Sequence, residues 1–157
     1  MSAAEPGPPE GTRQAAGSGR AALATGLRAT VTAEVTAADT AQALGSGDVP
    51  VLGTPRLLAL AEAATIAAVA PALAAGQTTV GIEVSLEHSR PAKVGSSVEV
   101  RAELTEIDGR RLVFMVVGYL GGTDGAAHEA GDPPVIGGGT VQRLLVDRER
   151  FLAKAGA

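Results

Sequence analysis

The sequence predicts an α+β domain in which about five antiparallel strands pack on one long helix. Three observations carry this prediction. Apolar and polar residues alternate with a period of two in several stretches, a single stretch has apolar residues at helical spacing, and short connections join most of them. The chain of 157 residues is about the length of one domain.

Strands are predicted over five segments, which are residues 27–36, 79–87, 98–105, 110–120 and 135–146. In the second segment Val80, Ile82, Val84 and Leu86 share one face, and His88 continues their parity. Asp108-Gly109 is a strong signal for a tight turn. The segment RRLVFMVVGYL that follows it is apolar on both faces and is predicted to be a central strand.

The helix is predicted to begin at Thr54-Pro55, with the threonine hydroxyl as a cap and proline in the first turn. It should end near Ala70, because Pro71 interrupts the hydrogen-bond ladder. The spacing predicts one apolar stripe made of Leu58, Glu62, Ile66, Val69 and Leu73. Glu62 is the acidic residue within that stripe, and its neighbours one turn away carry no positive charge.

Composition excludes several classes of protein. Hydrophobic residues make up 45% but aromatic residues only 2%, so Ala, Val, Leu and Ile must build the core. The absence of cysteine excludes disulfides and thiolate metal sites, and it fits a cytoplasmic location. With 13 basic and 17 acidic residues and no basic cluster, a nucleic-acid partner is not expected. We expect no membrane span, because no apolar stretch approaches about 20 residues, and no secretory signal at the N-terminus.

Residues 1–24 are rich in Ala, Gly and Pro and are predicted to be a disordered tail, followed by one domain over residues 25–157. Residues 121–134 are predicted to be a loop, and its His128-Glu129-Asp132 group lacks the frame of a metal site. The glycines of GGGT at 137–140 more plausibly admit a ligand or another backbone than a phosphate. RERF near the C-terminus is interpreted as a solvated charged segment.

Three polar residues in apolar surroundings are candidates for chemistry. An unpaired, buried Glu62 would be a candidate acid or base, and the alternative is a solvated face or an arginine from elsewhere in the chain. His88 is predicted to face the helix, and the alternative is a core histidine bonded to a backbone carbonyl. Thr54 is explained by capping alone, yet it lies only ~12 Å along the helix from Glu62.

The chain resembles the fluoroacetyl-CoA thioesterase-like family of hot-dog-fold proteins. The segments that carry the resemblance are VLGTPRLLALAEAA, QTTVGIEVSLEHSRPAKVG, VRAELTEIDGRRLVF and GGGTVQRLLVDRERF, in this order within residues 25–155. The resemblance implies a hot-dog fold, a homodimer whose sheets join, acyl-CoA bound between subunits, and a Thr/Glu/His set that matches Thr54, Glu62 and His88.

We therefore predict hydrolysis of a small or medium acyl-CoA, without a metal or cofactor. Glu62 acts as a general base or as a nucleophile that forms an anhydride, and His88 orients the attacking group and handles protons. Thr54 and the backbone at the helix start, including Gly53, are expected to bind the substrate and the developing oxyanion.

Cations near the pocket are expected to bind the CoA phosphates. Arg90 and Lys93, just beyond His88, are the first candidates. Arg143 is the residue retained from a family triplet in the last strand, and it is assigned the same role. The connection before the helix, AADTAQALGSGDVPVLG, lacks the aromatic lid of the fluoroacetate-specific member, which argues against fluoroacetyl-CoA as substrate.

Two other functions remain open from the sequence. Hot-dog folds also include hydratases and dehydratases of acyl thioesters, and a non-catalytic acyl-CoA-binding module would share the fold.

Overall fold

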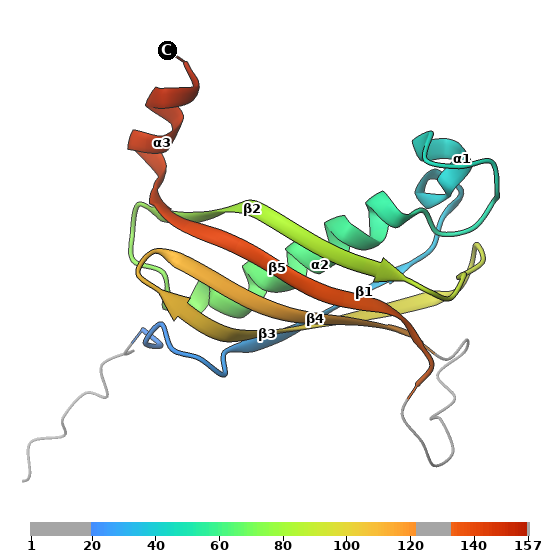
Figure 1. The fold of residues 1–157 in the computed structure, drawn as a ribbon, viewed down its shortest axis with the longest axis horizontal. Coiled ribbons are helices and arrows are strands. Elements are labelled where there is room, and N and C mark those ends of the chain that lie inside the picture. The colour runs from blue at the N-terminus through green and yellow to red at the C-terminus, as the bar shows by residue number, and fades with distance from the viewer. Residues whose placement is uncertain (1–19, 122–132, 157) are drawn as a thin grey trace, which may run out of the picture.

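The computed structural model describes residues 20–121 and 133–156. Its strands are β1 (Arg28–Glu34), β2 (Gln77–His88), β3 (Ser97–Asp108), β4 (Arg111–Leu120) and β5 (Val135–Asp147), and its long helix is α2 (Thr54–Val69). All pairings are antiparallel, in the order β1-β3-β4-β5-β2. Figure 1 shows α2 lying along one face of this sheet. The predicted α+β class and the central place of β4 are confirmed.

Four shorter elements complete the described chain: η1 (Ala37–Asp39), α1 (Ala41–Leu44), η2 (Ala70–Ala72) and α3 (Arg148–Ala155). The helix α3 covers the RERF segment, for which the sequence predicted only a solvated segment. Asp147 caps it, because its carboxylate accepts a hydrogen bond of 2.9 Å from the Arg150 N–H. No residue of α3 is buried, so the predicted exposure is confirmed although the helix was missed.

The buried face of α2 differs from the predicted stripe. The residues that face the sheet are Leu57, Leu60, Ala61, Ala64, Thr65, Ala68 and Val69. Ile66 is 48% exposed, and Leu58 and Glu62 are only partly covered. The prediction was wrong because it weighted large side chains. The alanines provide the flat surface on which a helix approaches a sheet closely, at full packing density.

The segment Thr54–Ala72 corrects the expectation that no apolar stretch is long enough to span a membrane. Its 19 residues have a mean hydropathy of 1.3, so by length and composition alone it is long and apolar enough to span a membrane. The buried core helix of a packed domain passes the same test. Here α2 packs on the sheet, and its buried leucines and alanines belong to the main hydrophobic core.

A β-bulge in β2 reverses the side-chain parity of that strand. The register against β5 shifts between Gly81 and Glu83, where Gly81 pairs with Arg143 and Val84 with Val141. Both of these β5 residues are buried on the helix side. Gly81 before the bulge and Val84 after it therefore lie on the same face of the sheet, which the predicted strict alternation does not allow.

The consequence of the bulge is visible on both sides of it. Ile82, predicted to face the helix, is 50% exposed. Val84, Leu86 and His88 keep the predicted orientation, because they lie after the bulge and pair with inward positions of β5.

The three consecutive glycines of β5 permit close approach of the neighbouring strand. A Cβ atom at Gly139 would collide with the Ser85 carbonyl oxygen, and one at Gly137 with the Glu87 carbonyl oxygen. Of the two explanations offered by the sequence, a ligand or another backbone, the structure supports the backbone.

We expect Gly139→Ala to lower the free energy of unfolding by about 1–3 kcal/mol, because the added methyl group must push two strands apart. Gly156→Ala is the matched control, since its nearest atom lies at 4.0 Å and its φ of −92° is open to alanine. Chemical denaturation of both variants checks the difference, and equal stabilities would contradict this explanation.

Most of the predicted tail and the predicted loop lie outside the described residues, and with them the His128-Glu129-Asp132 group. Residues on both sides of the predicted boundary at residue 25 contact the domain. Leu23 packs against the core, and the Gly26 N–H donates to the Leu104 carbonyl at 2.8 Å.

Candidate active site

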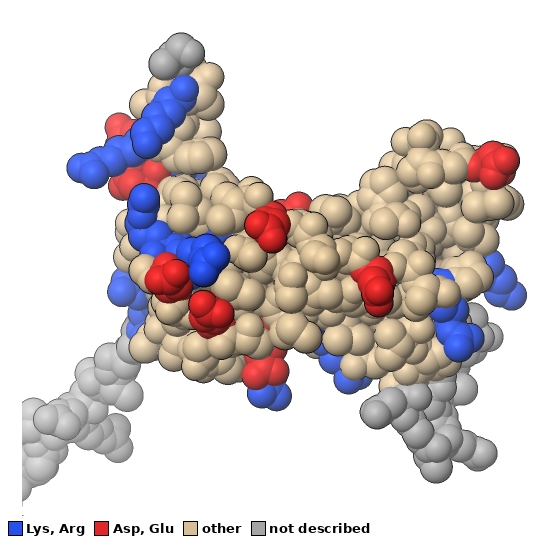
Figure 2. All heavy atoms as spheres, in the orientation of Figure 1, with Lys and Arg blue, Asp and Glu red and all other residues tan. Residues whose placement is uncertain are grey.

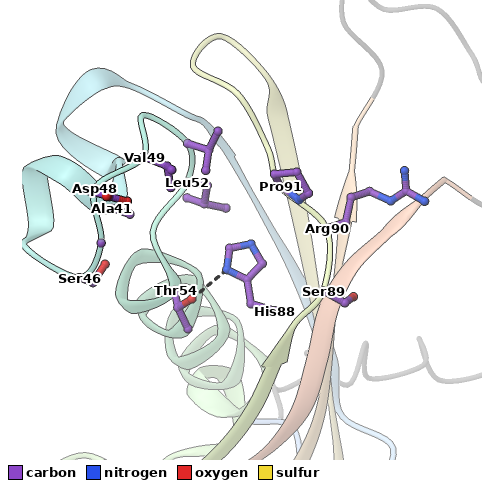
Figure 3. A pocket seen from close by; sticks show the side chains of 12 residues that line it. Ala41, Ser46, Asp48, Val49, Leu52, Thr54, His88, Ser89, Arg90 and Pro91 are labelled. Atoms are coloured by element: carbon purple, nitrogen blue, oxygen red, sulfur yellow. Dashed lines mark hydrogen bonds between the residues drawn. The ribbon is translucent and has the colours of Figure 1, made fainter.

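Thr54 and His88 meet where α2 begins. Thr54 Oγ1 lies 3.0 Å from His88 Nδ1, a contact between residues 34 positions apart. Figure 3 shows the two side chains facing each other at the end of β2. The cap of α2 is Gly53, with Thr54 as the first helical residue, so capping does not explain the Thr54 hydroxyl as the sequence had indicated. Pro55 lies in the first turn, as predicted.

The His88 ring keeps one hydrogen-bonding position unused. Its Nε2 atom is buried and has no partner among the described residues. A neutral imidazole carries one N–H and one acceptor nitrogen. Either Thr54 donates to Nδ1 and Nε2 carries the proton, or Nδ1 donates to Thr54 and Nε2 can accept one.

Burial favours the neutral ring. Desolvation lowers the pKa of His88 below 6.5, and the backbone of Arg90 acts in the opposite direction. A neutral imidazole at neutral pH is the form required of a general base. The ring contacts the Thr54 hydroxyl through Nδ1 and interacts with the backbone of Arg90, whereas Nε2 forms no hydrogen bond of good geometry within the described residues.

A cavity of about 340 Å³ opens beside this pair. Its wall is formed by α1 with the loop that follows it and by the end of β2, and its lining includes Asp48, Val49, Thr54, His88 and Arg90. In Figure 3 the His88 ring lies beside Thr54, on the side of Pro91, whereas the Arg90 side chain extends away from the ring. Lys93 does not line the cavity, although its backbone forms a bridge with Val51.

Gly53 has a structural role in this wall. Its N–H donates to the Asp39 carbonyl at 2.8 Å, so that group is not free to bind the substrate as the sequence had indicated. A Cβ atom at Gly53 would lie 3.2 Å from the Ala41 backbone. Glycine therefore lets α1 approach the start of α2.

Glu62 forms a different cluster, with Arg143. The Arg143 Nη1 donates to Glu62 Oε2 at 2.7 Å, and its other nitrogens donate to the hydroxyl and the carbonyl of Thr79 at 2.8 and 3.0 Å. This arrangement confirms the alternative that an arginine from elsewhere pairs with Glu62. Arg143 is only 4% exposed, so the predicted contact with a CoA phosphate does not fit.

Gly81 completes the Glu62 cluster. Any side chain at this position would collide with Glu62 Oε2, and the bulge in β2 brings both Thr79 and Gly81 to this side. The sequence analysis missed both residues. A glycine inside a strand pattern is a known signal for a bulge or a close approach, and it could have identified Gly81.

The structure thus brings two of the three predicted catalytic residues together within one chain. Glu62 lies eight residues after Thr54, a rise of ~12 Å along the helix, and its carboxylate is bound to Arg143. Within the described residues no group of three or more His, Asp or Glu side chains could hold a metal ion.

A five-stranded antiparallel sheet that holds one long helix is the hot-dog fold of thioesterases. Residues 35–149 match the family described as fluoroacetyl-CoA-specific thioesterase, and the chain belongs to this family. It is an acyl-CoA thioesterase.

Relatives of known sequence and structure agree. The fluoroacetyl-CoA thioesterase of Streptantibioticus cattleyicolor is 34% identical over 104 residues, which are 66% of this chain and 67% of that protein. A solved structure of the fluoroacetyl-CoA thioesterase FlK has a TM-score of 0.73 at 28% identity and covers 86% of this chain and 96% of that chain. A Thermus thermophilus thioesterase superfamily member has a TM-score of 0.70 at 26% identity, covering 83% and 89%.

Proposed function

We propose that this thioesterase hydrolyses a small or medium acyl-CoA with Thr54, His88 and Glu62. The observation that carries the proposal is the contact of 3.0 Å between Thr54 Oγ1 and His88 Nδ1 beside an open cavity. His88 handles protons, Thr54 orients the ring or donates to the developing oxyanion, and Glu62 is the base or the nucleophile. The Arg143 guanidinium fixes the position of the Glu62 carboxyl group, with 2.7 Å between Nη1 and Oε2.

Glu62 reaches this pair in a homodimer. Among the described residues β2 pairs on one side only, with β5, and its other edge is unpaired. An edge of 12 residues is a template for a second strand. Antiparallel pairing about the middle of β2 places Gly81 of one copy, and with it Glu62, opposite Val84 of the other copy. Along this edge Glu62 is then closer to His88 of the other copy than to His88 of its own. The reaction centre is then formed by two copies of the chain.

The acyl group is not limited to fluoroacetyl. The loop over the cavity contributes small and aliphatic residues such as Gly47 and Val49, and among the described residues the lining contains no Phe, Tyr or Trp. A threonine-to-serine variant of FlK has been solved with acetyl-CoA, and a threonine-to-alanine variant with fluoroacetate. Arg90 and Lys93 are exposed beside the cavity entrance, and we propose that they bind the phosphates of CoA.

Release of free thiol from a panel of acyl-CoAs tests this function. We expect turnover of short and medium saturated chains, and Glu62→Gln should lower kcat/KM by about 10²- to 10⁴-fold, because glutamine can neither accept the proton nor attack the carbonyl. The Glu106→Gln variant is the control, since Glu106 is a glutamate on β3 with a side chain 60% exposed, away from the β2 edge.

The alternatives give different results in the same panel. A change in enoyl absorbance without thiol release would identify a hydratase, and binding without turnover would identify a binding module. Full activity of Glu62→Gln, with its Tm unchanged, would remove Glu62 from the mechanism.

A further inference from the structure

The C-terminal helix α3 has an apolar face that is largely exposed to solvent. Phe151, Leu152 and Ala155 lie at i, i+1 and i+4 and form one stripe. Phe151 is 39% exposed and Leu152 is 58% exposed. A helix of eight residues is too short to be stable in water without tertiary contacts. The stripe therefore requires a surface to pack on, and the described part of the chain does not supply one.

Its position points to the unpaired edge of the sheet. In Figure 1, α3 extends beyond β2 at one end of this edge, and α1 with its following loop extends in the same direction at the other end. Figure 2 shows the hollow between the two projections. A second copy that pairs along β2 enters this hollow.

The symmetry of such a pairing determines which projections meet. Antiparallel strands related by a two-fold axis exchange the two ends of the edge. The α3 projection of one copy therefore lies against the α1 projection of the other, and not against its own equivalent.

The two surfaces are complementary in character. The α1 projection exposes Leu44 at 43% and Val49 at 49%, two large hydrophobic residues without cover. Its loop carries the acidic Asp48, whereas α3 carries three basic residues, Arg148, Arg150 and Lys154, and one acidic residue, Glu149. Figure 2 shows basic side chains together with acidic ones on the α3 projection, and an acidic one at the tip of the other. Apolar residues thus face apolar residues, and opposite charges surround them.

We propose that α3 of one copy docks on α1 and on residues 45–50 of the second copy, within the homodimer of the proposed function. Asp48 and Val49 of that loop also line the cavity that contains Thr54 and His88. Each copy therefore supplies an outer wall to the reaction centre of the other. This docking fixes the loop that the substrate must pass.

Cysteine pairing tests the contact directly, because the chain has no native cysteine. Leu44→Cys and Leu152→Cys are made as two separate proteins and mixed. Brief dilution lets the dimers exchange subunits, and the mixture is then oxidised. Non-reducing gel electrophoresis should then show a shift of up to about half of the chains to a covalent dimer, because random exchange places the two variants together in half of the dimers. The control mixture combines Leu152→Cys with Thr30→Cys, since Thr30 is exposed on β1 at the opposite edge of the sheet, and we expect no shift there.

Light scattering and thiol release, both measured on the wild-type protein, show whether the docking, the dimer or the proposed catalysis is wrong. A dimer in solution that gives no more Leu44–Leu152 link than the control overturns the docking and leaves the dimer intact. A monomer in solution overturns both the dimer and the docking. Absence of turnover for every acyl-CoA overturns the proposed catalysis, whereas the link tests the docking independently of it.

Discussion

The His88→Ala variant is expected to lose about 10²- to 10⁴-fold in kcat/KM while its Tm stays close to that of the wild type. The ring contributes proton transfer, but its Nε2 atom has no partner, so its removal deletes no strong interaction other than that with Thr54. Glu87→Ala is the matched control. Glu87 is the residue before His88 in β2, it is exposed, and its side chain lies on the opposite face of the sheet. A His88→Ala enzyme that retains full kcat/KM would contradict the assignment of the reaction centre.

The same residue should determine the pH dependence at the acidic side. Because the pKa of His88 is lowered by burial, kcat/KM of the wild type should be level above pH 6.5 and should fall as the pH decreases through the lowered pKa. The pH profile of His88→Ala should lack this fall.

The free energy of unfolding should also decrease as the pH falls. Between the lowered pKa and 6.5 the unfolded chain binds the proton and the folded chain does not, so stability is complete above 6.5 and is lost as the pH falls. Thermal unfolding at a series of pH values checks this, with His128→Gln as the control because the chain contains 2 histidines.

The alternation in β3 shows what the sequence alone can predict. Val98, Val100, Ala102 and Leu104 are buried as expected, because a regular strand with one wet face displays its orientation in its own pattern. The pattern in β2 looked equally regular. It was misleading at Ile82, because the bulge depends on the pairing with β5, which lies far away in the chain.

The candidate site follows the same rule. Thr54, Glu62 and His88 are identifiable as polar residues in apolar segments, and the family resemblance connects them. Their partners are not identifiable, because His88 is 34 residues from Thr54 and Arg143 is 81 residues from Glu62. Capping alone explained Thr54 in the sequence, and the family resemblance pointed Arg143 to a CoA phosphate. Neither contact exists without the assembled sheet.

Removal of the Arg143 guanidinium should have the largest effect on stability. We expect Arg143→Met to lower the free energy of unfolding by about 3 kcal/mol, because loss of one partner leaves the other charge incompletely solvated. This is the low end of the range for buried pairs, since the Glu62 side chain remains 32% exposed. The Thr79 hydroxyl and carbonyl lose their donors at the same time.

A double-mutant cycle with Glu62→Gln separates the pair from the rest of the cluster. The double variant should be more stable than the sum of the two single changes predicts, because neither charge is then left without its partner. Chemical denaturation of the four proteins gives the coupling energy, and strictly additive losses would show that the ion pair contributes nothing to the fold.

Kinetics of Arg143→Lys decides whether the arginine also positions Glu62 for the reaction. Lysine keeps the charge, but its single ammonium group cannot reproduce the planar set of bonds that joins Glu62 to both Thr79 atoms. If Arg143 orients the carboxylate, Arg143→Lys should lower kcat at a temperature where it is fully folded, with KM little changed. A purely structural arginine predicts the opposite result, a lower Tm with normal kcat. The Thr79→Val variant then tests the remaining contact, because it removes the hydroxyl while it leaves the ion pair and the carbonyl in place.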